Sequence, residues 1–400
     1  MYGFFSIPKA NRAYTPHMLL LSQPQTCCRH FGRCGGCTYQ HLSYQEQLEN
    51  KQIAIQQLFG QAEPIIGCDH PWQWRNKMEF SFSQNRAGDR FLGLMIKNSR
   101  GKVETLSECW IAQPWMVEVL QRVLTWWEQQ SLQAYHPPTD RGALRTLTLR
   151  EGIHTGEKMI VLTVCGHPEF ALTEAQKSAF LEAVGPHTSV ILRAQITARK
   201  TPTRFEQTLL YGTEFIQERL QNAKGESYLF KIRAASFFQP NTLQAQKLYQ
   251  KALEPLHQEK VVLDLYCGTG TLGIFAAQFA EQVVSVELVP EAVEDAKSNM
   301  VTNCVQNMTV YQGAVEHYLD KLPAASTIIL DPPRCGLSDQ GVQELCSLKP
   351  KKIIYISCNP QTQKKNIDAM EGYRIVGVQP VDQFPHTPHM ENIVFLESKV

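Results

Sequence analysis

The chain has 400 residues, of which 43% are hydrophobic and 19% charged, and its formal net charge is +1. A chain of this length can form two or three domains, each with a hydrophobic core. Its nearly neutral net charge excludes a protein that binds nucleic acid through its overall charge alone. No apolar run of about eighteen residues occurs, and residues 1–12 lack the apolar core of a secretory signal. We therefore expect a cytoplasmic protein that does not enter a membrane.

Residues 1–26 are expected to form a loosely held leader. They show no sustained hydrophobic period and contain Pro16 and Pro24. The leader is too short for a folded barrel domain. A cysteine-rich segment follows at 27–60, and its polar second part predicts a helix over residues 43–59.

The chain contains 12 cysteines at uneven spacings, and nothing marks it for export. Reduced thiols, metal ligands or a nucleophile are therefore expected rather than disulfides. Cys28, Cys34 and Cys37 follow a C-x5-C-x2-C spacing, and Gly35 and Gly36 give the loop room to wrap a metal centre. Zinc and a four-cysteine iron–sulfur cluster both suit such thiolates. The spacing favours neither, and a fourth ligand must come from elsewhere.

Residues 61–235 contain short β-rich runs such as MEFSFS, ALRTLTLR, MIVLTV and SVILRAQIT, which predict a central, largely antiparallel module. Basic and aromatic residues interleave between positions 72 and 102, a mixture that suits phosphate and base contacts. A solvated strand face over an aromatic core explains the same pattern, and we favour that interpretation. The residues concerned are Arg75, Lys77, Arg86, Arg90, Lys97, Arg100 and Lys102, among Trp72, Trp74, Phe80, Phe82 and Phe91.

Residues 236–400 are predicted to form an α/β domain, which a helix over 241–256 links to the central module. Strand candidates and helical stretches alternate from position 260 onward. The strand candidates are VVLDLY, VVSVEL, MTVYQG, STIILD, KKIIYIS, YRIVGVQPV and NIVFLES, and the main helices are expected at 271–280 and 290–303. This alternation predicts a Rossmann-like, mostly parallel sheet with its ligand crevice at the carboxyl ends of the strands.

A glycine-rich turn follows the first of these strands, with Gly268, Gly270 and Gly273 at the start of a helix. Glycines there let a ligand approach the backbone closely. Asp264 lies in the end of the strand, where a carboxylate suits an ammonium-bearing ligand and would repel a pyrophosphate. Glu287 closes the next strand, where it can accept hydrogen bonds from ribose hydroxyls. The pattern therefore favours S-adenosylmethionine over a dinucleotide.

Cys358 is the candidate nucleophile. It ends the strand KKIIYIS and precedes Asn359 and Pro360, which break the strand. A lone cysteine is usually a small buried hydrophobe. The strand-end position in an open α/β sheet lifts this one into the crevice and favours a nucleophile.

Two further segments bring polar residues to the same edge of the sheet. DPPR follows the fourth strand, so that Asp331 faces the crevice and two prolines hold Arg334 near it. FPHTPHMEN precedes the last strand and carries His386, His389 and Glu391. This density of titratable groups indicates acid–base chemistry.

The segments SFFQPN, LDLYCGTG, DPPR, SCNP and FPHTPHMEN occur in this order and resemble those of the 5-methyluridine RNA methyltransferases, a family of class I S-adenosylmethionine-dependent enzymes. The resemblance covers nearly the whole chain. It implies that Gln239, Tyr266, Glu287 and Asp331 bind S-adenosylmethionine, that Cys358 is the nucleophile and that Glu391 is the proton-abstracting base. The family often has an acidic residue directly after the glycine of the third strand's loop. This chain has Ala314 there and Glu316 two residues later, which leaves the adenine contact open.

The implied reaction explains these residue types. Carbon 5 of uracil is a poor nucleophile until a thiolate adds to carbon 6 and turns the ring into an enolate that can attack a methyl sulfonium. The proton left on carbon 5 must then depart before the enzyme is released, and this requires a general base. Cys358 and Glu391 are our candidates for the two roles.

The segment CRHFGRCGGC is similar to the cluster-binding motif of the ribosomal RNA members of this family, which hold a [4Fe-4S] cluster. The resemblance implies that Cys28, Cys34 and Cys37 are completed by Cys109, and that the substrate is 23S ribosomal RNA, since the transfer-RNA members lack the cluster. The motif resembles the RlmD type, whereas the absence of space for an amino-terminal TRAM barrel resembles the RlmC type. The target uridine therefore stays open, and we expect a monomer.

Two alternatives remain beside this interpretation. One is a methyltransferase that acts on transfer RNA or on cytosine. The other is a non-catalytic RNA-binding protein with an iron–sulfur or zinc centre. The presence of Cys358, Asp331 and Glu391 together argues against the second, because a decayed enzyme would be expected to lose at least one of them.

Overall fold

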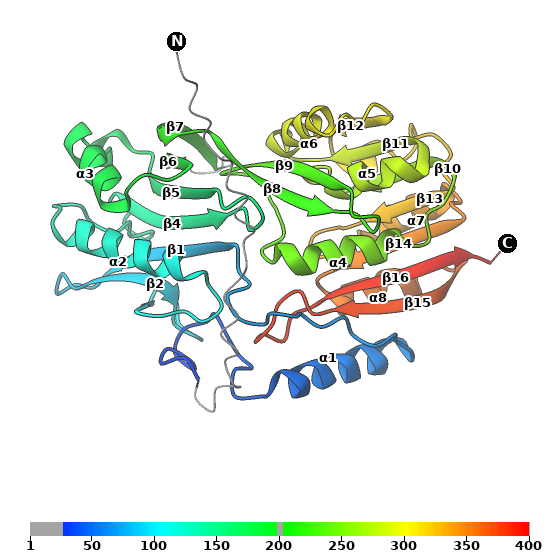
Figure 1. Ribbon diagram of the computed structural model, residues 1–400, viewed down its shortest axis with the longest axis horizontal. Helices are drawn as coiled ribbons and strands as arrows, with labels where there is room; N and C mark the ends of the chain where they lie inside the picture. Colours follow the sequence, from blue (N-terminus) through cyan, green and yellow to red (C-terminus); the bar gives the residue numbers. More distant parts are fainter. Residues whose placement is uncertain (1–26, 198–202, 400) are drawn as a thin grey trace, which may run out of the picture.

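The computed structural model describes residues 27–197 and 203–399, so the expected leader at 1–26 lies outside the described residues. The described residues form two seven-stranded sheets and a two-stranded hairpin (Figure 1). Helices pack on both sheets, which makes the fold mixed α/β, as the sequence predicts. Within the described residues, no helix is both long and apolar enough to cross a membrane.

The first sheet has the order β3-β2-β1-β4-β5-β6-β7, and all neighbours pair antiparallel except β5 and β6. It confirms the antiparallel character predicted for the central module. Helices α2 (Pro114–Glu128) and α3 (Glu174–Val184) pack on it. The strands are β1 (Lys77–Gln84), β2 (Arg90–Met95), β3 (Val103–Thr105), β4 (Leu144–Glu151), β5 (Lys158–Cys165), β6 (Ser189–Ile196) and β7 (Arg204–Gly212).

The interleaved aromatic residues of this sheet mainly form its core. Phe80 and Phe82 are buried, and Phe82 contacts Trp127 of α2 edge to face, with ring centroids 5.2 Å apart. Arg90 donates hydrogen bonds to the carbonyls of Trp127 and Gln130 at the end of the same helix. The interpretation as an aromatic core under a polar face is thus confirmed for these residues.

The second sheet has the order β12-β11-β10-β13-β14-β16-β15. The first five of these strands run parallel, and β16 runs antiparallel between β14 and β15. All seven predicted strands are present. They are β10 (Glu259–Leu265), β11 (Ala280–Glu287), β12 (Met308–Gln312), β13 (Thr327–Leu330), β14 (Lys352–Ser357), β15 (Tyr373–Val381) and β16 (Glu391–Ser398).

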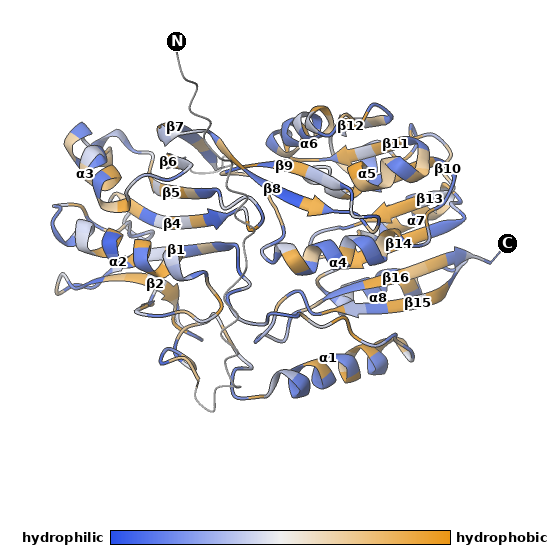
Figure 2. Cartoon of the chain, viewed as in Figure 1, coloured by the Kyte–Doolittle hydropathy of each residue, from blue (hydrophilic) through white to orange (hydrophobic). Residues whose placement is uncertain are grey.

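Four helices connect these strands, and their apolar faces pack on the sheet (Figures 1 and 2). The expected helix at 271–280 is shorter than predicted, because its end tightens into a 3₁₀ turn at Ala277–Phe279. The helices are α5 (Thr271–Ala276), α6 (Pro290–Thr302), α7 (Asp339–Ser347) and α8 (Pro360–Asp368).

Helix α1 (Tyr44–Phe59) begins and ends where the sequence predicts. Ser43 and Glu46 form a capping box at its start, and Gly60 takes a left-handed conformation at its end, with φ 77°. Its buried Ile55 and Phe59 join the core beneath the second sheet, against α8 and β15. Burying each such side chain contributes about 1.5–3 kcal/mol. The segment after the cysteine cluster is thus anchored on the α/β half of the molecule (Figure 1).

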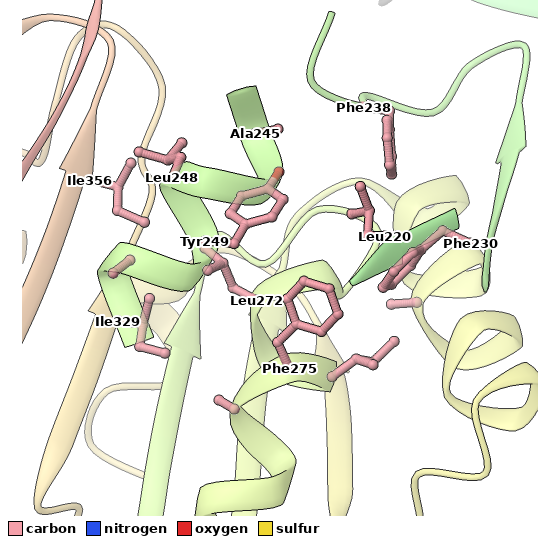
Figure 3. Close-up of a cluster of buried hydrophobic side chains, with 14 of the residues drawn as sticks. Leu220, Phe230, Phe238, Ala245, Leu248, Tyr249, Leu272, Phe275, Ile329 and Ile356 are labelled. Carbon is pink, nitrogen blue, oxygen red and sulfur yellow. The ribbon is translucent and has the colours of Figure 1, made fainter. Parts of the chain in front are cut away.

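A shared core joins the two sheets. The hairpin β8 (Phe215–Gln221) and β9 (Ser227–Arg233) and helix α4 (Thr242–Leu253) fill the space between them. Figure 3 shows Phe230 and Leu220 of the hairpin facing Phe275 of α5. Phe230 and Phe275 meet edge to face, with ring centroids 5.8 Å apart. This packing fixes the position of the first sheet beside the crevice of the second.

Candidate active site

Cys358 and Glu391 face each other at one end of the second sheet. Strands β14 and β16 are antiparallel, and their register pairs Ser357 with Asn392. The next position along each strand places Cys358 opposite Glu391. Burial raises the pKa of the Cys358 thiol, and the nearby Glu391 carboxylate raises it further. The topology therefore brings together the predicted nucleophile and the predicted base.

Glu391 lies in an apolar, acidic surrounding. Burial raises its pKa well above the usual value, and the Asp331 carboxylate adds to the rise. The positive charge of Arg334 and a hydrogen bond to the Gln239 side chain lower the pKa of Glu391 and partly offset this rise. Glu391 is 3% exposed, and its Oε2 atom has no hydrogen-bond partner among the described residues. A buried carboxyl oxygen without a partner is suited to receive a proton or a hydrogen bond from a ligand.

The DPPR turn brings Arg334 to Cys358, the predicted nucleophile. The Arg334 carbonyl accepts hydrogen bonds from Asn359 Nδ2 at 3.0 Å and from Thr362 Oγ1 at 3.1 Å. These bonds tie the turn to the segment that follows Cys358. The Arg334 side chain hydrogen-bonds to Cys358 and lowers the pKa of its thiol, partly offsetting burial. A cation beside the sulfur favours the reactive thiolate.

Asp331 and Gln239 complete this side of the crevice. Burial raises the pKa of Asp331 to about 7. Gln239 is 4% exposed, and its Oε1 accepts a hydrogen bond of 3.4 Å from Gln383, a residue that the sequence reasoning missed. The Gln239 carbonyl accepts a hydrogen bond of 3.0 Å from Asn76, which directly precedes β1. The first sheet thus supports a residue predicted to bind the cofactor.

The glycine-rich turn that follows β10 lies at the same carboxyl-end edge of the sheet as the end of β13. Tyr266 has a φ of 65°, and Gly268 has a φ of 55°. Glu287 holds the turn, because its Oε2 accepts a hydrogen bond from Gly268 N at 2.9 Å and its Oε1 accepts one from Val289 N at 2.8 Å. A Cβ added at Gly268 would meet no atom within 4 Å, so the backbone there borders open space.

These residues fit S-adenosylmethionine by their donor and acceptor chemistry. Each Glu287 oxygen keeps a lone pair for a ribose hydroxyl. The buried carboxyls of Asp331 and Asp264 favour a cationic ligand. Burial raises the pKa of Asp264 to about 7, although the Gly273 N–H acts against the rise. A Cβ at Gly273 would come within 2.7 Å of Asp264 Oδ2, so this glycine lets the helix approach the carboxyl.

Glu316 reaches the cofactor turn in place of an acidic residue at position 314. Tyr266 Oη donates a hydrogen bond of 3.2 Å to Glu316 Oε1. The carboxyl raises the pKa of the Tyr266 hydroxyl, after burial as the main cause. The sequence offered this residue only as a displaced acid two positions after Ala314.

Comparisons with known proteins agree with this geometry. The family model described as tRNA (Uracil-5-)-methyltransferase matches residues 43–399. The chain belongs to this family. An uncharacterized RNA methyltransferase of Protochlamydia amoebophila is 42% identical over 92% of this chain and 90% of its own length. One from Staphylococcus aureus is 33% identical over 93% of this chain and 84% of its own length.

A solved structure extends the likeness to three dimensions. It is the Pyrococcus abyssi tRNA (uracil-54, C5)-methyltransferase in complex with S-adenosyl-L-homocysteine, which is 28% identical. The match has a TM-score of 0.73 and covers 91% of this chain and 86% of that one. The protein is therefore an S-adenosylmethionine-dependent RNA uracil-5 methyltransferase.

The methyltransferase also brings its four predicted metal ligands together. Cys28, Cys34 and Cys37 are buried in one loop, and Cys109 packs beside them from a segment that follows β3. Burial raises the pKa of Cys28 to about 11 and that of Cys37 to about 12, and Cys109 adds to both. No group of three or more His, Cys, Asp or Glu side chains in the described part of the chain is arranged to hold a metal ion.

A cavity of about 520 Å³ lies beside Cys109, away from Cys358. Its walls include Trp72 and Trp110, whose rings meet edge to face at 5.6 Å, and Glu118. Trp72 also stacks on His386, with ring centroids 3.6 Å apart. His386 is buried, whereas His389 is exposed, so the two histidines of FPHTPHMEN lie in different surroundings.

Proposed function

We propose that the methyltransferase transfers a methyl group to carbon 5 of a uridine in 23S ribosomal RNA, through a covalent adduct between Cys358 and carbon 6 of the uracil. The observation that carries this proposal is the antiparallel register of β14 and β16, which sets Cys358 opposite Glu391. Asp331 and Arg334 lie at the same site. We further propose that the enzyme acts as a monomer in the cytoplasm.

Cys358 would add to carbon 6 as a thiolate, and the electron pair of the 5,6 double bond would move into an enolate. Arg334 supports this step because it lowers the pKa of the thiol. S-adenosylmethionine, held by Gln239, Tyr266, Glu287 and Asp331, would supply the methyl group that carbon 5 attacks. These residues contribute by binding and orienting, which can account for a large part of a rate enhancement.

Glu391 would then remove the proton from carbon 5. The electrons of that C–H bond re-form the 5,6 double bond, the carbon 6–sulfur bond breaks, and its electron pair returns to Cys358. Without a ligand, burial and Asp331 keep the pKa of Glu391 high and favour its protonated form. A positive charge beside the two acids favours their carboxylates, so cofactor binding would prepare the base.

The test replaces Cys358 by Ala or Ser and measures transfer of a labelled methyl group to unmodified ribosomal RNA. We expect transfer to stop in both variants. RNA that contains 5-fluorouridine at the target should trap a covalent complex with the wild type only, because fluorine at carbon 5 cannot leave as a proton. Undiminished transfer by Cys358→Ala would refute the mechanism.

The choice of ribosomal RNA rests on the four cysteines. The solved relative that acts on tRNA supports the alternative, a transfer-RNA 5-methyluridine methyltransferase. Mass mapping of both RNA classes from a strain that lacks the protein separates the two. Loss of one 5-methyluridine from 23S ribosomal RNA supports the proposal, and its loss from transfer RNA supports the alternative.

We also propose that Cys28, Cys34, Cys37 and Cys109 hold a [4Fe-4S] cluster. Cys28, Cys34 and Cys37 are buried and Cys109 packs beside Cys34 and Cys37, and four cysteine thiolates are the ligand set that such a cluster uses. Methyl transfer to an enolate needs no electron transfer, so the role would be structural. Anaerobically prepared protein should show oxygen-sensitive visible absorbance and about four iron atoms per chain. A colourless sample with stoichiometric zinc would contradict the proposal.

A further inference from the structure

A buried ion pair joins helix α1 to the loop between β15 and β16, which leads into Glu391, the first residue of β16. Lys51 Nζ contacts Asp382 Oδ1 at 2.5 Å, and the two side chains are 1% and 0% exposed. Lys51 also donates a hydrogen bond of 3.2 Å to the carbonyl of Phe384. Tyr44 Oη donates to Asp382 Oδ2 at 2.8 Å. Breaking a buried pair of this kind is strongly destabilising, so the start of the loop is held firmly.

Gln47 holds the middle of the same loop. Its side chain is 0% exposed. Its Oε1 accepts a hydrogen bond of 2.8 Å from His386 N, and its Nε2 lies 3.1 Å from His386 Nδ1. His386 has a φ of 64°, a conformation that is strained for a residue with a Cβ and persists only where the surroundings impose it. Gln47 is one of the groups that impose it.

The cysteine loop supports His386 from the other side. Thr38 N and Tyr39 N, which directly follow Cys37, donate hydrogen bonds of 2.9 and 3.0 Å to the His386 carbonyl. Trp72 stacks on the imidazole ring. The residue is therefore enclosed by contacts from α1, the cysteine loop and the segment before β1.

His386 is unsuited to carry a proton in the reaction. It is 2% exposed, and burial lowers its pKa to about 4, so the ring is neutral over the physiological range. It lies five residues before Glu391, in the loop that leads to this residue. His386 is therefore suited to hold the loop, and with it Glu391, in one position. The motif FPHTPHMEN thus combines one support residue and one reacting residue.

We propose that Gln47 and His386, braced by the Lys51–Asp382 pair, are positioning residues for Glu391. This inference rests on the proposed function, because it concerns the step in which Glu391 accepts the proton from carbon 5 and Cys358 recovers its electron pair. Loosening the loop displaces Glu391 while the thiol keeps its place on β14. Adduct formation and methyl transfer therefore continue, and release of the methylated RNA slows.

The experiment compares Gln47→Met with Tyr44→Phe and with Gln57→Met as a matched control. Gln57 lies on the same helix and is exposed. Methionine at position 47 keeps the side-chain length and removes both hydrogen bonds to His386, together with those that Gln47 donates to the carbonyls of Tyr39 and Leu42. Phenylalanine at position 44 removes the bond to Asp382 and the bond that the hydroxyl accepts from Cys68 N. Each variant is assayed with full-length protein and labelled RNA, in a single turnover and at steady state. Denaturing gels measure the covalent RNA–protein complex.

We expect Gln47→Met to lower steady-state turnover roughly ten- to hundredfold, since a misplacement of about 1 Å can cost that much. Single-turnover methyl transfer should stay within about twofold of the wild type. The covalent complex, transient in the wild type and in Gln57→Met, should accumulate. Tyr44→Phe should also slow turnover more than single-turnover methyl transfer, to a smaller degree. If Gln47→Met does not fold, the test is made with Tyr44→Phe.

Two results overturn the inference. One is unchanged turnover in both variants, and the other is a parallel fall of methyl transfer and turnover without accumulation of the complex. A wild type that methylates no RNA and forms no adduct refutes the proposed function itself, and the inference falls with it. If the wild type methylates RNA but neither variant combines slowed turnover with nearly unchanged single-turnover methyl transfer, the inference alone is refuted.

Discussion

The contact between Arg334 and Cys358 allows the activation of the nucleophile to be tested in the absence of RNA. Arg334→Gln removes the positive charge and the hydrogen bond that lower the pKa of the thiol, while burial and Glu391 continue to raise it. The thiolate should therefore appear only at higher pH in the variant. The direction is fixed by the sign of the lost charge.

The size of the effect follows from the exposure of Arg334. A hydrogen bond to a charged group contributes about 1.5–3 kcal/mol when shielded from water. Arg334 is exposed, and water screens exposed charges strongly, which reduces the contribution to about 1 kcal/mol. This corresponds to a roughly fivefold smaller thiolate population at a given pH below the thiol pKa.

Alkylation by iodoacetamide, followed at the Cys358 peptide by mass spectrometry across a pH series, measures this population directly. Arg374→Gln is the control, because Arg374 lies on β15 and pairs with Glu397 at 3.1 Å, away from the nucleophile. The control should follow the wild type. An alkylation profile of Arg334→Gln that coincides with the wild type would show that Arg334 does not activate Cys358.

Three further predictions concern the cofactor side. Glu287→Gln should weaken S-adenosylmethionine binding about tenfold in calorimetry, because a neutral amide is a weaker acceptor for ribose hydroxyls; unchanged affinity would exclude Glu287 from the site. Burial raises the pKa of Asp264 to about 7 in the folded protein, from an ordinary value of 3.8, so its contribution to stability falls as pH rises between these values, by about 2 kcal/mol from pH 5 to 7. Asp264→Asn should remove that part of the slope in urea unfolding, and an identical slope would contradict the burial argument. Gly273→Ala should lower stability by about 1–3 kcal/mol through crowding against Asp264, whereas Gly372→Ala, which meets no atom within 4 Å, should change the melting temperature little.

The sequence predicts the α/β half well because its signals are local. A strand that is followed by a glycine-rich turn or by DPPR can be predicted from its own residues. The alternation of strands with helices then predicts that the strands are parallel. The site at the carboxyl ends of β10, β13 and β14 is then a geometric consequence. The pairing of Cys358 with Glu391 needs one further fact, the antiparallel insertion of β16 beside β14, which periodicity alone does not contain.

The supports of the site were not predictable in this way. Lys51 and Asp382 are separated by 331 positions, and each looks like an ordinary surface charge in its own segment. Gln47 lies on a helix whose polar composition suggested exposure, yet it is fully buried. Only the packing of α1 against α8 and β15 turns these polar residues inward, and that packing depends on long-range contacts.

The placement of α1 bears on why an RNA methyltransferase would retain buried charges in its core. In many proteins, replacing a buried ion pair such as Lys51–Asp382 with apolar residues costs little stability. A hydrophobic contact, however, tolerates sliding, whereas a pair that also binds Tyr44 and the Phe384 carbonyl allows one position of the loop. The proposed adduct at Cys358 would make that distinction matter, because a base displaced by about 1 Å would leave the enzyme bound to its own product. Under the proposed mechanism, the need to release the RNA, more than stability, accounts for polar residues at this depth.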